Sequence, residues 1–228
     1  KNVLKCFSIK NGEEIWKVKT EKSFIKSQKK LSLIIVNDVI YFNNSVGDIS
    51  AVNINNGNLI WQTPTRGSEV LDEQIFLKTS DLIADNDTIL FSNNKNEFFS
   101  LDITSGTLNW IQKINSSLRP TLVDDIVFSV SLEGFLFVLD KDSGNIIRVT
   151  DIFNQFKKKN RSKIKPIGFI VGSKNIYLTT SHGRLIIIDI LSGKAISVLK
   201  IDKDKISRPF VLNENLYIIK ENSVIRLN

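Results

Sequence analysis

The residue types that carry most enzyme chemistry are scarce in this 228-residue sequence. Cys6 is the only cysteine, so the chain can form neither an intrachain disulfide nor a cysteine-based zinc site. His182 is the only histidine, and it stands between Ser181 and Gly183 with neither a G-x-S-x-G motif nor an evident third partner. We therefore predict an exposed turn at His182 and no catalytic residue.

Acidic or amide side chains recur at one position of a repeated motif, directly after an apolar run and shortly before a glycine. They are Asn53, Asp102, Asp140 and Asp189. A calcium site would need several carboxylates gathered in one oxygen cage, and no such spacing is present. Asp and Asn in turns commonly accept hydrogen bonds from nearby backbone N–H groups. We predict turn carboxylates at Asp102, Asp140 and Asp189, a turn amide at Asn53, no metal site and no cofactor.

The chain carries a net charge of +7 and one dense basic cluster. The cluster consists of Lys157, Lys158, Lys159, Arg161, Lys163 and Lys165. We interpret it as a solvated loop, with contact to nucleic acid or anionic lipid as the alternative. No apolar run is long enough to cross a bilayer. Methionine is absent, so we expect the natural chain to start upstream of Lys1.

The elements that would position any site come from an internal repeat. Each copy reads as a strand, a tight turn with a glycine, and a second apolar strand; the stretch 47–61 is the most regular copy. The turn glycines are Gly12, Gly57, Gly106, Gly144 and Gly193, at separations of 45, 49, 38 and 49 residues. A period in the forties with several strands per repeat is typical of β-propeller blades.

Apolar stretches between the copies supply two further strands per repeat, and no stretch shows a sustained 3.6-residue period. We predict an all-β fold, a single β-propeller of four-stranded antiparallel blades, with four complete and two partial blades. The expected boundaries are a partial blade at 1–20, blades at about 21–63, 64–113, 114–150 and 151–200, and a terminal partial blade at 201–228.

The two partial blades would both supply a third strand, which does not make one neat closing blade. We therefore expect this chain to be the C-terminal part of a larger ring of seven or eight blades. A compact ring of five or six blades is the alternative.

Three copies of the repeat end in tryptophan, at Trp16, Trp61 and Trp110, whereas Arg148 and Ser197 take that position later. The pattern of apolar strand, Asp or Asn, glycine turn and apolar-apolar-Trp resembles the repeats of quinoprotein-type (PQQ-like) β-propellers. In those repeats the tryptophan packs between adjacent blades. The resemblance implies that the three tryptophans seal neighbouring blades, which suits the large area and specific geometry of an aromatic side chain.

Within that superfamily the chain resembles the BamB family of outer-membrane assembly lipoproteins. The resemblance rests on the long connection 63–80, the order of blade lengths and the ending 221–228. It implies a non-enzymatic scaffold in the bacterial cell envelope, at the periplasmic face of the outer membrane. The implied partner is a protein, the BamA-like central assembly protein, bound through its periplasmic domains. Nucleic acid is not implied, and membrane association would need a lipid anchor outside this chain.

The family's docking contacts align with residues 23–30, where this sequence offers Phe24, Ile25 and Lys26, with Gln28 near a position that is Arg in the family. A second family contact uses two acidic residues on a turn, and only Glu133 is acidic here. The resemblance implies partner binding by these residues. The alternative for Phe24 and Ile25 is local packing under a loop.

A quinone-dependent dehydrogenase is the alternative from a different functional class, since the superfamily includes such enzymes. They resemble one another in a vicinal cysteine pair, calcium ligands and a carboxylate base around the central channel. A single cysteine excludes the vicinal pair. A sensor or adaptor propeller with an unrelated partner is the second alternative.

Overall fold

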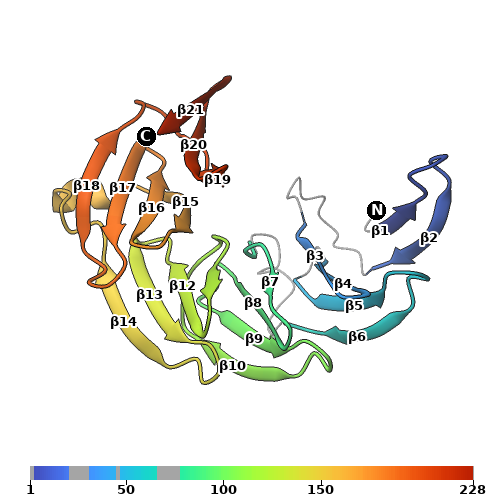
Figure 1. The fold of residues 1–228 in the computed structure, drawn as a ribbon. Coiled ribbons are helices and arrows are strands. Elements are labelled where there is room, and N and C mark those ends of the chain that lie inside the picture. Colours follow the sequence, from blue (N-terminus) through green and yellow to red (C-terminus); the bar gives the residue numbers. More distant parts are fainter. Residues whose placement is uncertain (1–2, 21–30, 45–46, 66–77, 228) are drawn as a thin grey trace.

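The computed structural model describes residues 3–20, 31–44, 47–65 and 78–227. These residues form six antiparallel sheets that follow one another around an arc (Figure 1). The sheet at the N-terminal end and the sheet at the C-terminal end stand on either side of the open part of the arc. The predicted all-β propeller fold with four-stranded antiparallel blades is confirmed.

Four sheets have four strands each, and in every one the strands are ordered as they occur in the chain. The first comprises β3 (Leu33–Val36), β4 (Val39–Asn43), β5 (Ile49–Asn53) and β6 (Leu59–Thr63). The second comprises β7 (Ile83–Ala84), β8 (Thr88–Ser92), β9 (Phe98–Asp102) and β10 (Leu108–Gln112). The third comprises β11 (Thr121–Val123), β12 (Ile126–Val130), β13 (Phe135–Asp140) and β14 (Ile146–Asp151). The fourth comprises β15 (Pro166–Val171), β16 (Asn175–Thr180), β17 (Arg184–Asp189) and β18 (Ala195–Lys200).

The sheets at the two ends of the arc have fewer strands. One is the pair β1 (Val3–Phe7) and β2 (Glu14–Lys19), and the other comprises β19 (Phe210–Leu212), β20 (Asn215–Lys220) and β21 (Ser223–Leu227). The one helix in the described ranges is α1 (Lys158–Arg161), between β14 and β15. No described helix has the length and apolar character needed to span a membrane. The expected domain boundaries and the size of a complete ring stay predictions.

The hydrophobic core lies between neighbouring sheets, and the middle strands of the four-stranded sheets each bury at least half of their residues. All five residues of β8 are buried, whereas the outermost strand β10 buries only Trp110. One core cluster joins Tyr41 and Ile49 of one sheet to Phe91 and Phe99 of the next. The rings of Phe91 and Phe99 stack with centroids 4.9 Å apart. Burial of such large apolar side chains is the main force that holds one blade against another.

Candidate functional site

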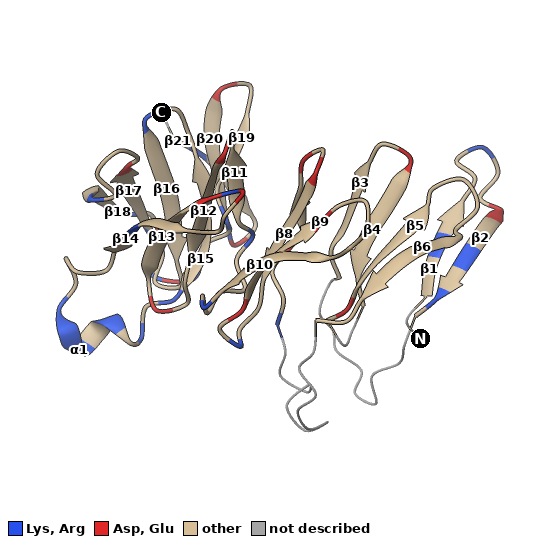
Figure 2. Cartoon of the chain, turned by 90° about the horizontal axis from the view of Figure 1, so that it is seen from below, with Lys and Arg blue, Asp and Glu red and all other residues tan. Residues whose placement is uncertain are grey.

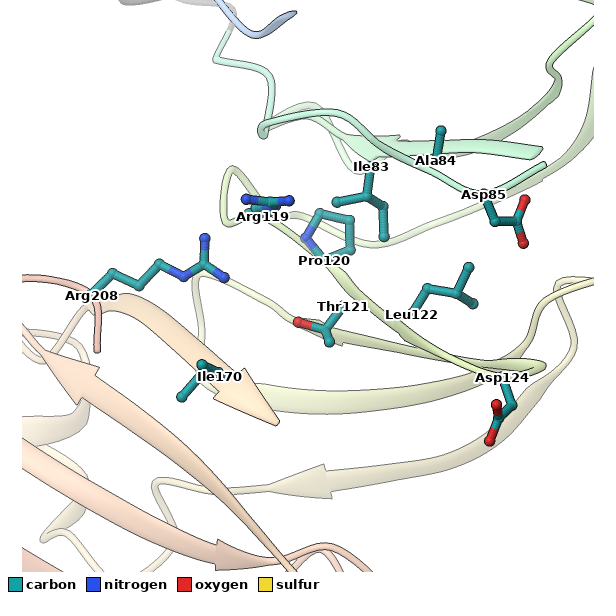
Figure 3. A pocket seen from close by; sticks show the side chains of 10 residues that line it. All are labelled: Ile83, Ala84, Asp85, Arg119, Pro120, Thr121, Leu122, Asp124, Ile170 and Arg208. Carbon is teal, nitrogen blue, oxygen red and sulfur yellow. The ribbon is translucent and has the colours of Figure 1, made fainter. Parts of the chain in front are cut away.

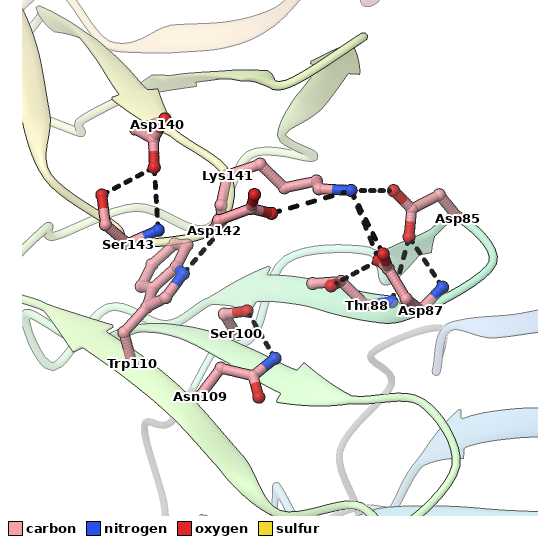
Figure 4. A network of polar contacts seen from close by, with 10 residues as sticks. All are labelled: Asp85, Asp87, Thr88, Ser100, Asn109, Trp110, Asp140, Lys141, Asp142 and Ser143. Carbon is pink, nitrogen blue, oxygen red and sulfur yellow. Dashed lines mark hydrogen bonds and ion pairs between the residues drawn. The ribbon is translucent and has the colours of Figure 1, made fainter.

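The three tryptophans that end the repeats each reach from one sheet to the next. The indole N–H of Trp16 donates to the carbonyl of Ile54 at 2.9 Å, and that of Trp61 donates to Ile103 at 3.1 Å. Each acceptor lies just after the third strand of the following sheet. Trp110 repeats the arrangement with the carbonyl of Lys141 at 2.7 Å (Figure 4). The structure therefore places all three side chains at contacts between blades.

A glycine in the turn of the following sheet makes room for each of these rings. At Gly106, a Cβ atom would lie 2.5 Å from Cε3 of Trp61, closer than real side chains approach. Gly57 and Gly144 meet Trp16 and Trp110 in the same way. The repeat glycine is thus needed for the ring of the preceding blade as well as for its own turn.

Arg148 takes the place of tryptophan in the β11–β14 sheet and makes the corresponding contact. Its guanidinium donates to the carbonyl of Ile190 at 2.9 Å and also to that of Leu191. The side chain lies against Gly193, whose Cβ would come within 3.0 Å of the Arg148 Nε atom. From the sequence alone, the replacement of tryptophan by Arg148 suggests that the contact between blades is lost in this repeat. The retained glycine in the next repeat was the signal that a side chain still packs there.

An ion-pair cluster lies beside the Trp110 contact and joins the same two sheets. Lys141 Nζ lies 3.1 Å from Asp85 Oδ2 and 3.4 Å from Asp87 Oδ1 (Figure 4). The hydrogen bond to Asp85 raises the pKa of Lys141 above its ordinary value. The Lys141 side chain is mostly covered, so these charges stabilise the blade contact more than an exposed pair would.

The repeated aspartates serve their own turns. Asp140 Oδ1 accepts hydrogen bonds from the Ser143 hydroxyl at 2.6 Å and from the Ser143 N–H at 2.8 Å. Asp102 and Asp189 make the same pair of contacts with the serine three residues later. In each case the serine hydroxyl is the main reason that the pKa of the aspartate lies below its ordinary value. The prediction of turn carboxylates is confirmed.

Other candidate chemistry is not assembled in the described part of the chain. His182 is exposed, and its Nδ1 lies 3.0 Å from the Ser181 hydroxyl in the same turn. Within the described ranges, no group of three or more His, Cys, Asp or Glu side chains could hold a metal ion. In the basic cluster, Arg161 pairs with Asp151 at 2.8 Å and also donates to the carbonyls of Asn154 and Phe156. Arg161 therefore stabilises its own loop.

The predicted partner-binding residues fall into two groups. Phe24, Ile25, Lys26 and Gln28 lie outside the described residues. Glu133 is exposed in the turn between β12 and β13. Because successive strands run in opposite directions, this turn lies at the same end of the blade as the connection that holds α1 (Figure 2).

The turn at Glu133 is held from two directions. The Asn115 amide, from the preceding connection, donates to Glu133 Oε1 at 2.5 Å. The buried ring of Phe153 packs on Gly134, and the N–H of Ile152 donates to the Gly134 carbonyl at 3.0 Å. These contacts hold the backbone of the turn in place, so the Glu133 carboxylate has a fixed position at the end of the blade that also carries α1.

Residues 1–150 of the sequence match the family described as outer membrane protein assembly factor BamB. A search of curated proteins finds no match. The crystal structure of BamB from Moraxella catarrhalis is similar with a TM-score of 0.63 and 17% identity, over 99% of this chain and 78% of that one.

Two further solved structures share the architecture. The computationally designed protein Ika8 gives a TM-score of 0.72 at 12% identity, over 98% of this chain and 67% of that one. The β-propeller domain of Cps50 (Swd1) from Myceliophteria thermophila gives 0.64 at 12% identity, over 85% and 62%. At such identities the likenesses to solved structures show the propeller fold alone.

Proposed function

Since the chain belongs to the BamB family of PQQ-like β-propellers, we propose that it is a non-enzymatic scaffold for the assembly of outer-membrane proteins. It binds the periplasmic domains of the BamA-like central assembly protein and works at the periplasmic face of the outer membrane. The match of residues 1–150 to the family is the observation that carries this proposal.

The docking surface that we propose is the end of the blades where each fourth strand leads into the next first strand. Glu133 is exposed there on its fixed turn. Residues 24–28 are flanked by two described strand ends, Lys19 of β2 and Leu33 of β3. Both belong to the same end of the blades as Glu133, because the strands of every sheet alternate in direction in the same order. Binding residues commonly lie on loops that a rigid scaffold positions.

The chemistry of these residues suits a protein partner. Phe24 and Ile25 supply apolar anchors, and Lys26 and Glu133 supply opposite charges that would fix the orientation of the partner. Immobilised periplasmic domains of the central assembly protein from the same organism provide the direct test by biolayer interferometry. We expect Phe24→Ala combined with Lys26→Glu and Lys29→Glu to weaken binding at least about tenfold, because anchors and steering charge are lost together.

A matched charge reversal is available at the opposite end of the blades. Lys10 and Lys194 are exposed in turns between third and fourth strands, so Lys10→Glu with Lys194→Glu changes the net charge equally. This control should bind like the wild type, and circular dichroism should show the same β-rich spectrum for all variants. Equal weakening by both charge reversals would remove residues 24–29 from the docking surface, and no binding by the wild type would contradict the proposed function.

The dehydrogenase alternative predicts a different outcome in the purified protein. A catalytic quinoprotein would carry quinone and calcium at about one equivalent each. Absorbance spectroscopy and elemental analysis measure both directly. A stoichiometric amount of either would contradict the scaffold proposal.

A further inference from the structure

A cavity of about 570 Å³ opens among the innermost strands of the arc (Figure 3). Its apolar lining comes from Ile83, Pro120, Leu122 and Ile170. Two arginines, Arg119 and Arg208, occupy one end. The volume lies in the range of pockets that hold small molecules.

Arg208 is held so that the end of its side chain faces this cavity. Its stem packs on Gly168, where an added Cβ would lie 2.6 Å from the Arg208 Cγ atom. Its Nε–H donates to the carbonyl of Phe169 at 3.1 Å. Figure 3 shows the guanidinium pointing toward Arg119 and Pro120. The two terminal nitrogens are thus presented to the cavity on a fixed stem.

Arg119 brings a second positive charge to the same place. It is exposed, and no hydrogen bond or ion pair engages its guanidinium among the residues that the structure describes. Burial lowers the pKa of Arg208, and the charge of Arg119 lowers it further, while Asp81 acts in the opposite sense. One carboxylate against two guanidiniums leaves an excess of positive charge at this end.

The arginines occupy equivalent positions in two blades. Each precedes a proline that leads into the first strand of its sheet, as Arg119-Pro120 before β11 and Arg208-Pro209 before β19. Proline restricts the preceding residue to an extended backbone, so both side chains leave the chain in a defined direction. Lys165 also precedes a proline, but Pro166 is itself the first residue of β15, and Lys165 does not line the cavity.

The opposite end of the cavity carries two carboxylates, Asp85 and Asp124. The Asp85 carboxylate is already paired with Lys141 at 3.1 Å. Asp124 is exposed in the turn after β11, at the far end of the cavity from the two arginines. The cavity therefore combines an unpaired cationic end with an apolar wall, and a guanidinium is the side chain best suited to bind a carboxylate through two parallel hydrogen bonds.

We infer that this cavity is a binding site for a small organic anion, with its carboxylate between Arg119 and Arg208 and an apolar body against Pro120, Leu122 and Ile170. Arg119 and Arg208 stand in connections from a fourth strand to the next first strand, so this site lies at the same end of the blades as the proposed docking surface. The cavity and its two arginines carry the inference, which does not depend on the proposed function.

Benzoate is a suitable probe, because it joins a carboxylate to a compact apolar ring. Benzamidine has the same ring with the opposite charge and serves as the matched ligand control. We propose titrating each into the whole chain while following the arginine Nε–H signals by NMR, with isothermal calorimetry for affinity. Benzoate should shift the Arg208 signal, and benzamidine should not.

Arg119→Ala is the decisive variant, because this exposed side chain has no described partner whose loss would disturb folding. It should weaken benzoate binding about tenfold, whereas Arg226→Ala, an equal charge change at an exposed site outside the cavity, should leave it unchanged.

Five results would overturn the inference, and four of them concern small ligands and the two variants. These four are the absence of benzoate binding, equal weakening by both variants, equal binding of benzamidine, and equal or tighter binding of inorganic phosphate, which lacks an apolar body. A tetraglutamate peptide that binds more tightly than benzoate would instead assign the two arginines to a polypeptide partner, and would also overturn it.

Discussion

Gly106→Ala should cost far more stability than its backbone conformation alone explains. Gly106 has a φ of +71°, a left-handed conformation that costs an alanine roughly 1–2 kcal/mol. Its new Cβ would also lie 2.5 Å from Cε3 of Trp61 and 2.7 Å from Oγ1 of Thr63. Overpacking of this kind costs about 1–3 kcal/mol. We therefore expect the free energy of unfolding to fall by about 2–5 kcal/mol.

Gly12→Ala separates the two contributions. Gly12 has nearly the same backbone, with φ at +74°, and a Cβ there would meet nothing within 4 Å. Its substitution should cost only the conformational part, roughly 1–2 kcal/mol. Combining Gly106→Ala with Trp61→Leu tests the contact directly, because a smaller side chain at 61 should reduce the added cost at 106 toward the value at 12.

Urea unfolding followed by far-ultraviolet circular dichroism gives the free energies, provided that the slopes with denaturant agree among variants. The reasoning would be refuted if Gly106→Ala cost no more than Gly12→Ala. It would also be refuted if the cost of Gly106→Ala were undiminished in the Trp61→Leu background. Either result would mean that the ring does not require glycine in the following blade.

Three further predictions concern the contacts between blades and the turn carboxylates. Arg148→Ala should lower the free energy of unfolding by about 1–3 kcal/mol, because two carbonyls of the next blade lose their donor, whereas Arg226→Ala should change it by less than about 0.5 kcal/mol in the same urea assay. Trp110→Phe should cost about 1–2 kcal/mol through loss of the 2.7 Å indole bond, and an unchanged denaturation midpoint would count against that role. The pKa of Asp140 is lowered in the folded state, so its stabilising contribution is complete above its ordinary pKa of 3.8 and is lost as the pH falls through the lower folded-state value. Ser143→Ala should return the Asp140 pKa toward 3.8 in a carboxyl NMR titration, and an unaltered titration would exclude the hydroxyl as the cause.

The contacts between blades suggest how a repeat can lose its most visible residue and keep its architecture. Each contact needs a large side chain in the fourth strand of one blade. In the turn after the third strand of the next blade it needs a backbone carbonyl that accepts a hydrogen bond and a glycine that leaves room for the side chain. Trp110 satisfies this with one N–H, whereas Arg148 satisfies it with two terminal nitrogens. A guanidinium stem also covers apolar surface. A tryptophan ring and an arginine side chain can therefore make the same kind of contact with the turn of the following blade.

The sequence by itself determined the fold, because propeller blades are local structures. The glycine turns at a period in the forties, the apolar alternation and the turn carboxylates Asp102, Asp140 and Asp189 all act within a few residues of their partners. The three tryptophans could be assigned to blade contacts because the motif recurs and resembles a known repeat.

Only the tertiary structure decided which residues from distant repeats meet. Arg148 contacts carbonyls some forty residues later in the chain, and the cavity brings Arg119 and Arg208 together from two different blades. Such pairings depend on the curvature of the arc and on the direction of each side chain, which no local pattern encodes. The hydrogen bonds within turns can therefore be predicted from the sequence. A site formed by residues of several blades that face the centre can be found only from the arrangement of the blades in space.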